Sequence, residues 1–121
     1  MIDVLAGFPD GVVAFAARGK VTRSDYADVL VPKVEEAFAR HKKIRCYYEL
    51  GPLFSGMDPG AAWEDFKVGL EHVSSWEKVA IVTDVDWIRR AVNVLRFIVP
   101  GEIRVFESNQ ASEAQTWITT D

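Results

Sequence analysis

The sequence predicts an α/β fold with a mainly parallel five-stranded sheet and helices on both faces. The first observation is that strand-like segments alternate with segments of helical spacing, in the order β-β-α-β-α-β-α-β-α. The second is the short turn Pro9-Asp10-Gly11, which joins the first two strands and implies an antiparallel hairpin. Since helices connect the later strands, right-handed crossovers make those strands parallel and leave the N-terminal strand as an antiparallel edge.

The predicted strands are short and rich in apolar and branched residues. They are Ile2 to Phe8, Val12 to Ala17, Ile44 to Leu50, Lys78 to Val82 and Ile103 to Phe106. The fourth strand is almost uninterrupted in its apolar character, which is typical of a strand covered on both faces. The segment Gly51 to Met57 contains two glycines and is predicted to be a loop.

The predicted helices begin at recognisable start signals. Thr22 can cap the first helix, with Asp25 as its capping-box partner, and Pro32 inside that helix predicts a kink or a break. The second begins at Asp58-Pro59, because aspartate caps a helix and proline suits its first turn. The others are predicted at Asp86 to Val99, ended by Pro100-Gly101, and from Ser108 or Asn109 through Ile118.

Length and composition predict one globular domain over residues 1–121. Hydrophobic residues make up 49% of the chain and charged residues 26%, which is ordinary for a folded domain. The formal net charge is −4 and there is no long basic run, so nucleic acid is not expected as a partner.

The cysteine content and the apolar segments of the sequence predict the cellular compartment. Cys46 is the only cysteine, so no internal disulfide can form, and a lone thiol with apolar neighbours suits a reducing cytoplasm. The first ten residues do not resemble a secretory signal, and the longest apolar-rich segment, Val85 to Val99, contains three arginines. We expect a soluble cytoplasmic protein that does not span a membrane, with attachment to a membrane surface left open.

The fold predicts where a site would lie. In open α/β sheets, ligands bind beyond the carboxyl ends of the parallel strands, and long loops at those ends often carry function. The alternative is that these loops only connect elements. We predict a ligand or partner site at this edge, built from Arg18, Glu49, Phe54, Ser55, Met57, Trp63, Asp84, Trp87, Ile88 and Leu95.

The carboxylates near this edge have structural explanations. Asp84 and Asp86 could serve a metal or acid–base chemistry, but we interpret both as caps of the third helix. Glu49 can form a structural salt bridge with Arg18. No catalytic residue is therefore predicted, and an enzyme using Glu49, Asp84 or Ser55 is the least favoured hypothesis.

No metal or cofactor is predicted either. His41 and His72 are far apart and share no ligand spacing, and no nucleotide-binding, nucleophile-elbow or C-x-x-C motif is present. Cys46 has no helix start or cationic cluster beside it, so we interpret it as a buried packing residue.

The third predicted helix has an unusually wide apolar arc. Its polar residues fall on one narrow stripe, and the rest of its surface is apolar. Neighbouring helices on both sides would explain this pattern. The alternative is that the surplus surface, with Ile88 and Leu95 as candidates, meets a dimer partner, an acyl chain or a membrane surface.

Several stretches together resemble a known family. They are GKVTRSDYADVLVPKVEEAF, IRCYYEL, PGAAWEDFKVGLEH, VAIVTDVDWIRRA, VPGEIRVF and AQTWI, and they cover nearly the whole chain in order. They resemble the SpoIIAA-like family of small bacterial proteins, which is related in fold to STAS domains (sulfate-transporter and anti-sigma-factor-antagonist domains). The resemblance implies a STAS-like fold.

The resemblance also has implications for function. It extends loosely to CRAL-TRIO lipid-transfer domains, for which lipid binding has been supposed. STAS antagonists carry a phosphorylatable serine in a D-S-S-G-like motif. In this sequence only Ser55-Gly56 matches part of that motif, so phosphorylation of that kind is not expected. Two hypotheses follow: a non-catalytic module that binds a lipid or another apolar small molecule, or a protein-interaction domain acting as a homodimer or regulator.

Overall fold

The computed structural model describes residues 1–58, 76–97 and 101–120. The predicted second helix, with Trp63, and the end of the predicted third helix lie outside these residues. The strands are β1 (Ile2–Val4), β2 (Val12–Val21), β3 (Ile44–Met57), β4 (Trp76–Thr83) and β5 (Glu102–Phe106). The helices are α1 (Arg23–Asp25), the π-helical η1 (Tyr26–Leu30), α2 (Val31–Arg40), α4 (Asp86–Leu95), the 3₁₀ turn η2 (Ser108–Gln110) and α5 (Ala111–Thr119).

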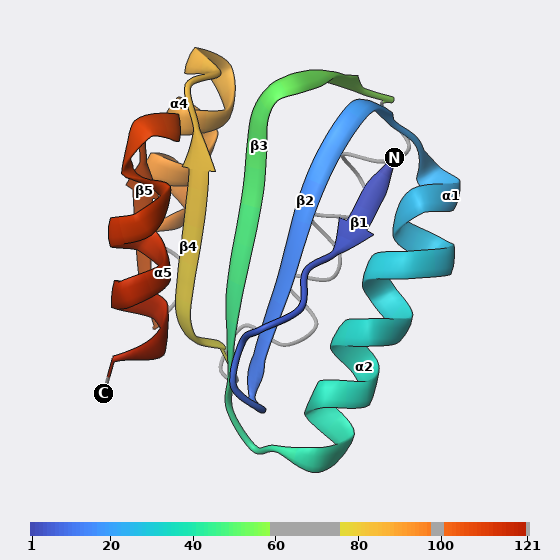
Figure 1. Cartoon of the computed structure of the whole chain (residues 1–121), viewed down its shortest axis with the longest axis vertical. Coiled ribbons are helices and arrows are strands. Elements are labelled where there is room, and N and C mark those ends of the chain that lie inside the picture. Colours follow the sequence, from blue (N-terminus) through green and yellow to red (C-terminus); the bar gives the residue numbers. More distant parts are fainter. Residues whose placement is uncertain (59–75, 98–100, 121) are drawn as a thin grey trace.

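The sheet has the predicted architecture. Its five strands lie in the order β1-β2-β3-β4-β5, with β1 antiparallel to β2 and every other pair parallel (Figure 1). The carboxyl ends of the parallel strands therefore share one edge of the sheet. The mixed α/β fold class and the antiparallel N-terminal edge strand are confirmed.

β1 is shorter than the predicted strand Ile2 to Phe8. The antiparallel pairing ends at Val4 opposite Phe15, and the Leu5 amide then donates to the Ala14 carbonyl at 2.9 Å. The chain leaves the sheet beyond Leu5, because Gly7 adopts a φ of 89° that turns the backbone away from a strand path. It returns at β2, where the Val12 amide donates to the Pro9 carbonyl at 3.1 Å.

The first helical region begins as predicted and changes pitch before Pro32. Thr22 accepts a hydrogen bond from the Asp25 amide at 3.3 Å, and the Asp25 carboxylate accepts one from the Thr22 amide at 2.8 Å, which confirms the capping box. The next turn is π-helical, and the Val31 amide donates to the Tyr26 carbonyl. Pro32 then lies in the first turn of α2, where its missing N–H is tolerated, so the irregularity precedes the proline and the helical path continues.

The segment Gly51 to Met57, predicted to be a loop, is instead the last part of β3. It continues alongside an extended β2, pairing Gly19 with Phe54 and Val21 with Met57 after a register shift. The extension is held at its end, where the Asp58 amide donates to the Val21 carbonyl at 3.0 Å and Lys20 pairs with the Asp58 carboxylate at 2.8 Å. The two glycines are therefore accommodated within a bent two-stranded ribbon (Figure 1).

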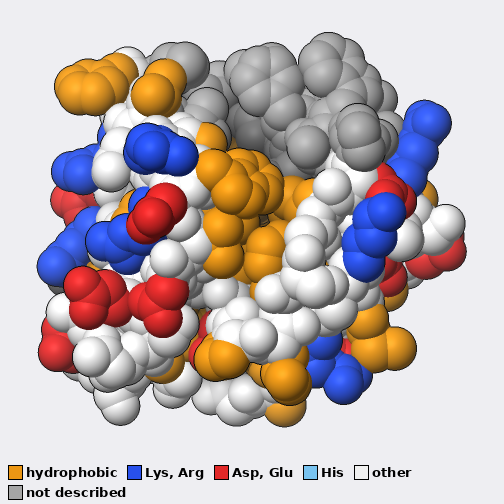
Figure 2. Space-filling model, turned by 90° about the horizontal axis from the view of Figure 1, so that it is seen from above, with side chains coloured by type: hydrophobic (Ala, Val, Ile, Leu, Met, Phe, Trp, Pro, Cys, Tyr) orange, Lys and Arg blue, Asp and Glu red, His pale blue; other side chains and the backbone are white. Residues whose placement is uncertain are grey.

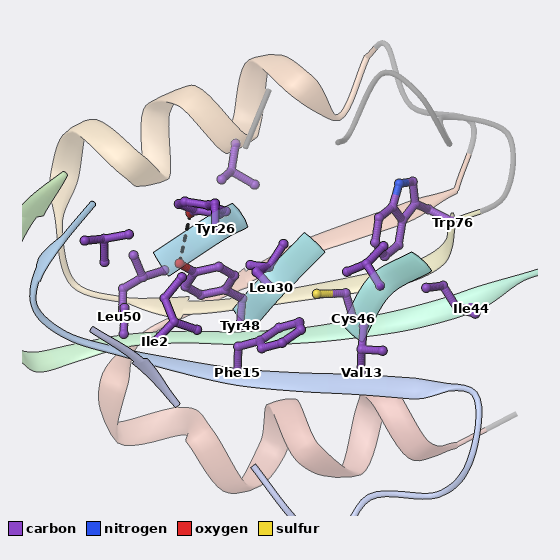
Figure 3. Packing of buried hydrophobic residues seen from close by; sticks show 14 of the residues in the cluster. Ile2, Val13, Phe15, Tyr26, Leu30, Ile44, Cys46, Tyr48, Leu50 and Trp76 are labelled. Atoms are coloured by element: carbon purple, nitrogen blue, oxygen red, sulfur yellow. Dashed lines mark hydrogen bonds between the residues drawn. The ribbon is translucent and has the colours of Figure 1, made fainter. Parts of the chain in front are cut away.

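Helices pack on both faces of the sheet, as predicted. On one face, Phe15, Tyr48 and their neighbours form a core with residues of η1, α2 and α4. On the other face, Tyr47 and Phe106 pack beneath Ala114 and Ile118 of α5. Figure 3 shows the larger core, with α4 and α5 on opposite sides of the sheet and the Tyr26 and Tyr48 hydroxyls 3.0 Å apart.

Candidate functional site

The carboxyl edge of the sheet exposes apolar side chains. Figure 2 looks onto this edge and shows hydrophobic side chains gathered in a hollow near the middle of the face. At the bent end of β3, Leu53 is 70% exposed, while Phe54 and Met57 are half-buried and pack against the larger core. Ser55 lies exposed between them. This end of β3 contains three of the predicted site residues.

Arg18 pairs with Asp3, and the predicted pairing with Glu49 is wrong. Its Nε donates to Asp3 Oδ2 at 2.5 Å and its Nη2 donates to Asp3 Oδ1 at 3.2 Å. The reason is register, because Asp3 lies on β1 directly opposite Ala16, on the same face of the sheet as Arg18. The hydrogen bond from Arg18, reinforced by its charge, holds the pKa of Asp3 below its usual value. Glu49 is half-buried on the neighbouring β3.

Asp84 caps a different helix from the one predicted. Its Oδ1 accepts a hydrogen bond from the Ser108 amide at 3.0 Å, at the start of η2, while α4 begins after Val85 without a side-chain cap. The ends of β4 and β5 are adjacent, so the end of β4 lies beside the start of η2. Hydrogen bonding from Ser108 lowers the pKa of Asp84. Asp86 is the first residue of α4.

Thr83 and Arg89 fix the entry to α4. The buried Thr83 hydroxyl accepts a hydrogen bond from the Val85 amide at 3.1 Å, and Arg89 Nη1 donates to the Thr83 carbonyl at 3.1 Å. Thr83 was not among the predicted site residues. A threonine whose hydroxyl accepts the amide two residues further on, just before a helix, is a recognised local turn signal and could have identified it.

α4 is apolar on both its inner and its outer face. Ile88 is 7% exposed and packs with Val92 in the larger core, so this candidate for outward-facing surface is a core residue. The side chain of Leu95 lies outside what the structure describes. The outward apolar residues are Trp87 (49% exposed), Val94 (63%) and Phe97 (92%), with the exposed Ala91 between them. We call Trp87, Ala91, Val94 and Phe97 the α4 outer stripe.

The stripe is contiguous because of its spacing. Positions 87, 91 and 94 follow one another by four and three residues, which places them on one face of a helix. Phe97 follows in a last turn in which its amide donates to the Val94 carbonyl at 3.2 Å. The sheet covers the inner face of α4, while the described residues leave this outer face uncovered. The wide apolar arc of the sequence therefore includes outward-facing surface.

A cavity lies at the other end of the sheet, and sequence reasoning missed it. It has a volume of about 500 Å³ and lies between the 5–11 connection and α2. Its charged lining residues are Asp10, Lys33 and Arg40. The signal in the sequence was weak, because only the tertiary structure places residues of α2 opposite the hairpin connection.

The described residues provide no cluster for a metal ion. Within residues 1–58, 76–97 and 101–120, no group of three or more His, Cys, Asp or Glu side chains could hold one. His41 Nε2 lies 3.1 Å from Asp10 Oδ2, and Cys46 is buried in the larger core as predicted. His72 lies outside the described residues. Among the helices of the described residues, none is both long and apolar enough to cross a membrane.

These features define a small open-sheet α/β domain with apolar surface at the carboxyl edge and on one helix. The chain belongs to the SpoIIAA-like family, whose model matches residues 12–119. It is similar to the crystal structure of an uncharacterized protein of the DUF3478 family with a SpoIIAA-like fold from Shewanella loihica PV-4. The two are 31% identical, the match covers 98% of this chain and 92% of that one, and the TM-score is 0.76. No protein of curated function matches the chain.

Proposed function

We propose that this chain is a non-catalytic binding domain that associates with a second copy of itself through the α4 outer stripe. The observation that carries this proposal is the exposure of Trp87, Val94 and Phe97 along one side of one helix. Folded monomers rarely expose contiguous apolar surface of this kind unless it meets a partner. Tryptophan in particular is enriched among the residues that dominate binding energy at protein interfaces.

The shape of the surface favours a protein partner over a small ligand. The stripe lies on the outward side of a helix and is convex, whereas small apolar molecules bind in concave pockets that enclose most of their surface. A second helix laid against the stripe would bury these side chains by ordinary helix packing. Partner association is thus the function that this surface serves best.

The charges beside the stripe favour a second copy. Asp86 is exposed at the start of α4, and Arg90 is exposed one turn later beside Trp87 and Val94. In a two-fold symmetric pair the same residues meet from both sides. If the two α4 helices ran antiparallel, each Arg90 would approach the carboxylate of the other copy's Asp86.

The role of Asp84 supports a non-catalytic domain. Asp84 accepts the Ser108 amide, so its carboxylate acts in holding the fold. Ser55 is exposed on the β3 extension, between side chains that pack against the core.

The decisive experiment introduces a charge into the outer stripe. Val94→Asp should raise the dimer dissociation constant by roughly a hundredfold, because burying an unpaired carboxylate in an apolar interface is costly. Sedimentation equilibrium over a range of concentrations measures this constant. The variant should fold normally, since Val94 is 63% exposed.

Leu53→Asp is the matched control. Leu53 is also an exposed apolar residue, at 70%, but it lies on β3 and outside the stripe. It should leave the dissociation constant unchanged. A native chain that stays monomeric at millimolar concentration, or a dimer that tolerates Val94→Asp, would overturn the proposed self-association.

A second candidate function is binding of an apolar small molecule at the carboxyl edge. It is favoured by the hollow in Figure 2 and by the half-buried Phe54 and Met57, which line the end of β3. Native mass spectrometry of gently purified protein distinguishes the two functions. A bound lipid that is lost in Leu53→Asp but kept in Val94→Asp would establish this candidate, and a dimer mass without an adduct would establish the first.

A further inference from the structure

β5 is the outermost strand of the sheet and pairs only with β4 (Figure 1). Within the described part of the chain, the backbone groups of Glu102–Phe106 form no hydrogen bond outside this ladder. An edge strand presents a row of amides and carbonyls with which a further strand can pair. The β5 edge can therefore extend the sheet by one more strand.

The side chains of β5 alternate between the two faces of the sheet. Ile103 and Val105 pack with the larger core, whereas Phe106 packs with the smaller core beneath α5. Because successive residues of a strand point to opposite faces, Glu102 and Arg104 share the α5 face with Phe106. Both are exposed. The edge strand thus carries an acid and a base two positions apart on one face.

Neither of these charges is compensated by the residues that the structure describes. The Arg104 guanidinium lies over the rings of Phe106 at 4.9 Å and Trp117 at 5.3 Å, and no described carboxylate lies within 4.0 Å of it. Glu102 lies opposite Lys78 on β4, but the Lys78 ammonium donates to carbonyls at the end of α5. Both charges are available to a partner strand.

The sequence of the edge strand is complementary to itself. If two copies of β5 run antiparallel with Ile103 opposite Ile103, each Glu102 lies directly opposite the other copy's Arg104. Opposite charges in such cross-strand pairs stabilise a sheet, whereas like charges destabilise it. A register centred on Arg104 would instead place two arginines opposite each other. The charges therefore favour a second copy and fix the register at Ile103.

We infer that two copies of this chain pair their β5 strands antiparallel about Ile103 and join their sheets into one continuous sheet. The inference rests on the proposed self-association and adds the sheet edge to it. Since α4 packs over the same core as Ile103, a two-fold axis at this edge places the two α4 helices antiparallel on one face of the joined sheet.

Charge reversal tests this pairing. Glu102→Arg places arginine opposite arginine twice across the two-fold axis, and Arg104→Glu likewise places glutamate opposite glutamate. Each variant alone should raise the dimer dissociation constant about tenfold in sedimentation equilibrium. An equimolar mixture of the two variants should recover the native constant, because every arginine in the mixed pair again faces a glutamate.

Two exposed residues away from β5 provide matched controls. Glu113→Arg on α5 and Lys43→Glu after α2 make charge changes of the same sign and size. Each control alone, and the mixture of both, should leave the dissociation constant unchanged. Thermal melts show whether each variant folds.

Amide hydrogen exchange tests the same edge in the native chain. At concentrations above the dissociation constant, outward amides within residues 102–106 should exchange about tenfold more slowly than in dilute protein, because a partner strand would accept their hydrogen bonds. This measurement carries the test if Arg104→Glu does not fold.

The possible failures are distinguishable. Self-association that weakens in Val94→Asp but is unchanged in folded Glu102→Arg would overturn the β5 pairing and leave the proposed function intact. A mixture of the charge variants that associates no more tightly than either alone, or β5 exchange that is independent of concentration in an associating chain, would also overturn it. A native chain that is monomeric at millimolar concentration would overturn both proposals.

Discussion

Several polar side chains in this domain bind groups that are distant in the sequence. Asp84 lies two residues before α4, yet it accepts the amide of Ser108, which is 24 positions further along the chain. Arg18 follows the same pattern, since its carboxylate is Asp3 on the neighbouring strand. Sequence proximity assigned Asp84 to the helix that follows it, and a shared edge of the sheet suggested Glu49 for Arg18, whereas the adjacency of strands decides the actual partners.

Removal of the Asp84 carboxylate should have a pH-dependent effect. The pKa of Asp84 is lowered in the folded chain, so its stabilisation is present above the unfolded pKa of ~3.9 and is lost as the pH falls through the lower folded pKa. Asp84→Ala should therefore lower the melting temperature by a few degrees near neutral pH, and the difference should shrink toward zero below about pH 3. Thermal unfolding followed by circular dichroism across this range measures both.

The control for Asp84 is a carboxylate that forms no ion pair or hydrogen bond with the described residues. Asp28 is exposed on η1, and Asp28→Ala should not reproduce the pH-dependent loss. A difference between native and Asp84→Ala protein that persisted unchanged at acid pH would show that the carboxylate charge is not what stabilises η2.

At the scale of elements, two strands hold the C-terminal end of α5. Arg45 of β3 donates from Nη1 to the Ile118 carbonyl at 3.0 Å and to the Thr120 carbonyl at 2.9 Å. Lys78, its register partner on β4, donates to the Trp117 carbonyl at 3.2 Å and to the Thr120 carbonyl at 2.7 Å. The last carbonyls of a helix lack partners within it, and cations are favoured there, so the sheet caps this helix through side chains.

Loss of this cap should destabilise the whole fold. Arg45→Met removes two helix-end hydrogen bonds and the ion pair with Glu77 while keeping an apolar stem over the sheet. We expect a loss of about 1–3 kcal/mol in the free energy of unfolding, measured by urea denaturation.

Lys43→Met provides the comparison for Arg45→Met. Lys43 is an exposed cation two positions away in the chain, so its loss should change the free energy of unfolding by less than about 0.5 kcal/mol. Equal stability of the two variants would mean that the contacts of Arg45 with the α5 carbonyls contribute nothing measurable.

At the scale of the whole molecule, the α4 outer stripe and the cavity beside α2 lie over different strands. The cavity is bordered by β2 and the connection that precedes it, while α4 packs on the core together with Ile103 of β5. Three strand spacings of ~4.8 Å separate β2 from β5. This separation leaves the two surfaces without shared side chains.

Much of the fold followed from local patterns. The strands around Ile44 and Ile103, the cap at Thr22 and the parallel order of the sheet were all predicted, because apolar periodicity and turn residues act over a few positions. The extension of β3 through Gly51 to Met57 was not predicted. Glycine and proline there indicate a loop, and only the pairing with β2 keeps this segment extended.

The candidate site was predicted less completely than the fold. The wide apolar arc of α4 indicated surplus surface, but the sequence could not decide which residues face outward, and Ile88 proved to be core while Trp87 and Val94 are exposed. Where an apolar arc exceeds the width that one sheet covers, the orientation of the helix depends on its packing. Periodicity alone does not contain that information.

The sequence by itself determined the order of the elements, the antiparallel edge strand and the presence of excess apolar surface on one helix. The tertiary structure alone decided the partners of Arg18 and Asp84, the outward side of α4 and the cavity opposite Lys33. The physical reason is range: hydrogen-bonding propensity and apolar periodicity are local properties of the chain, whereas these contacts form between segments that only the folded sheet brings together.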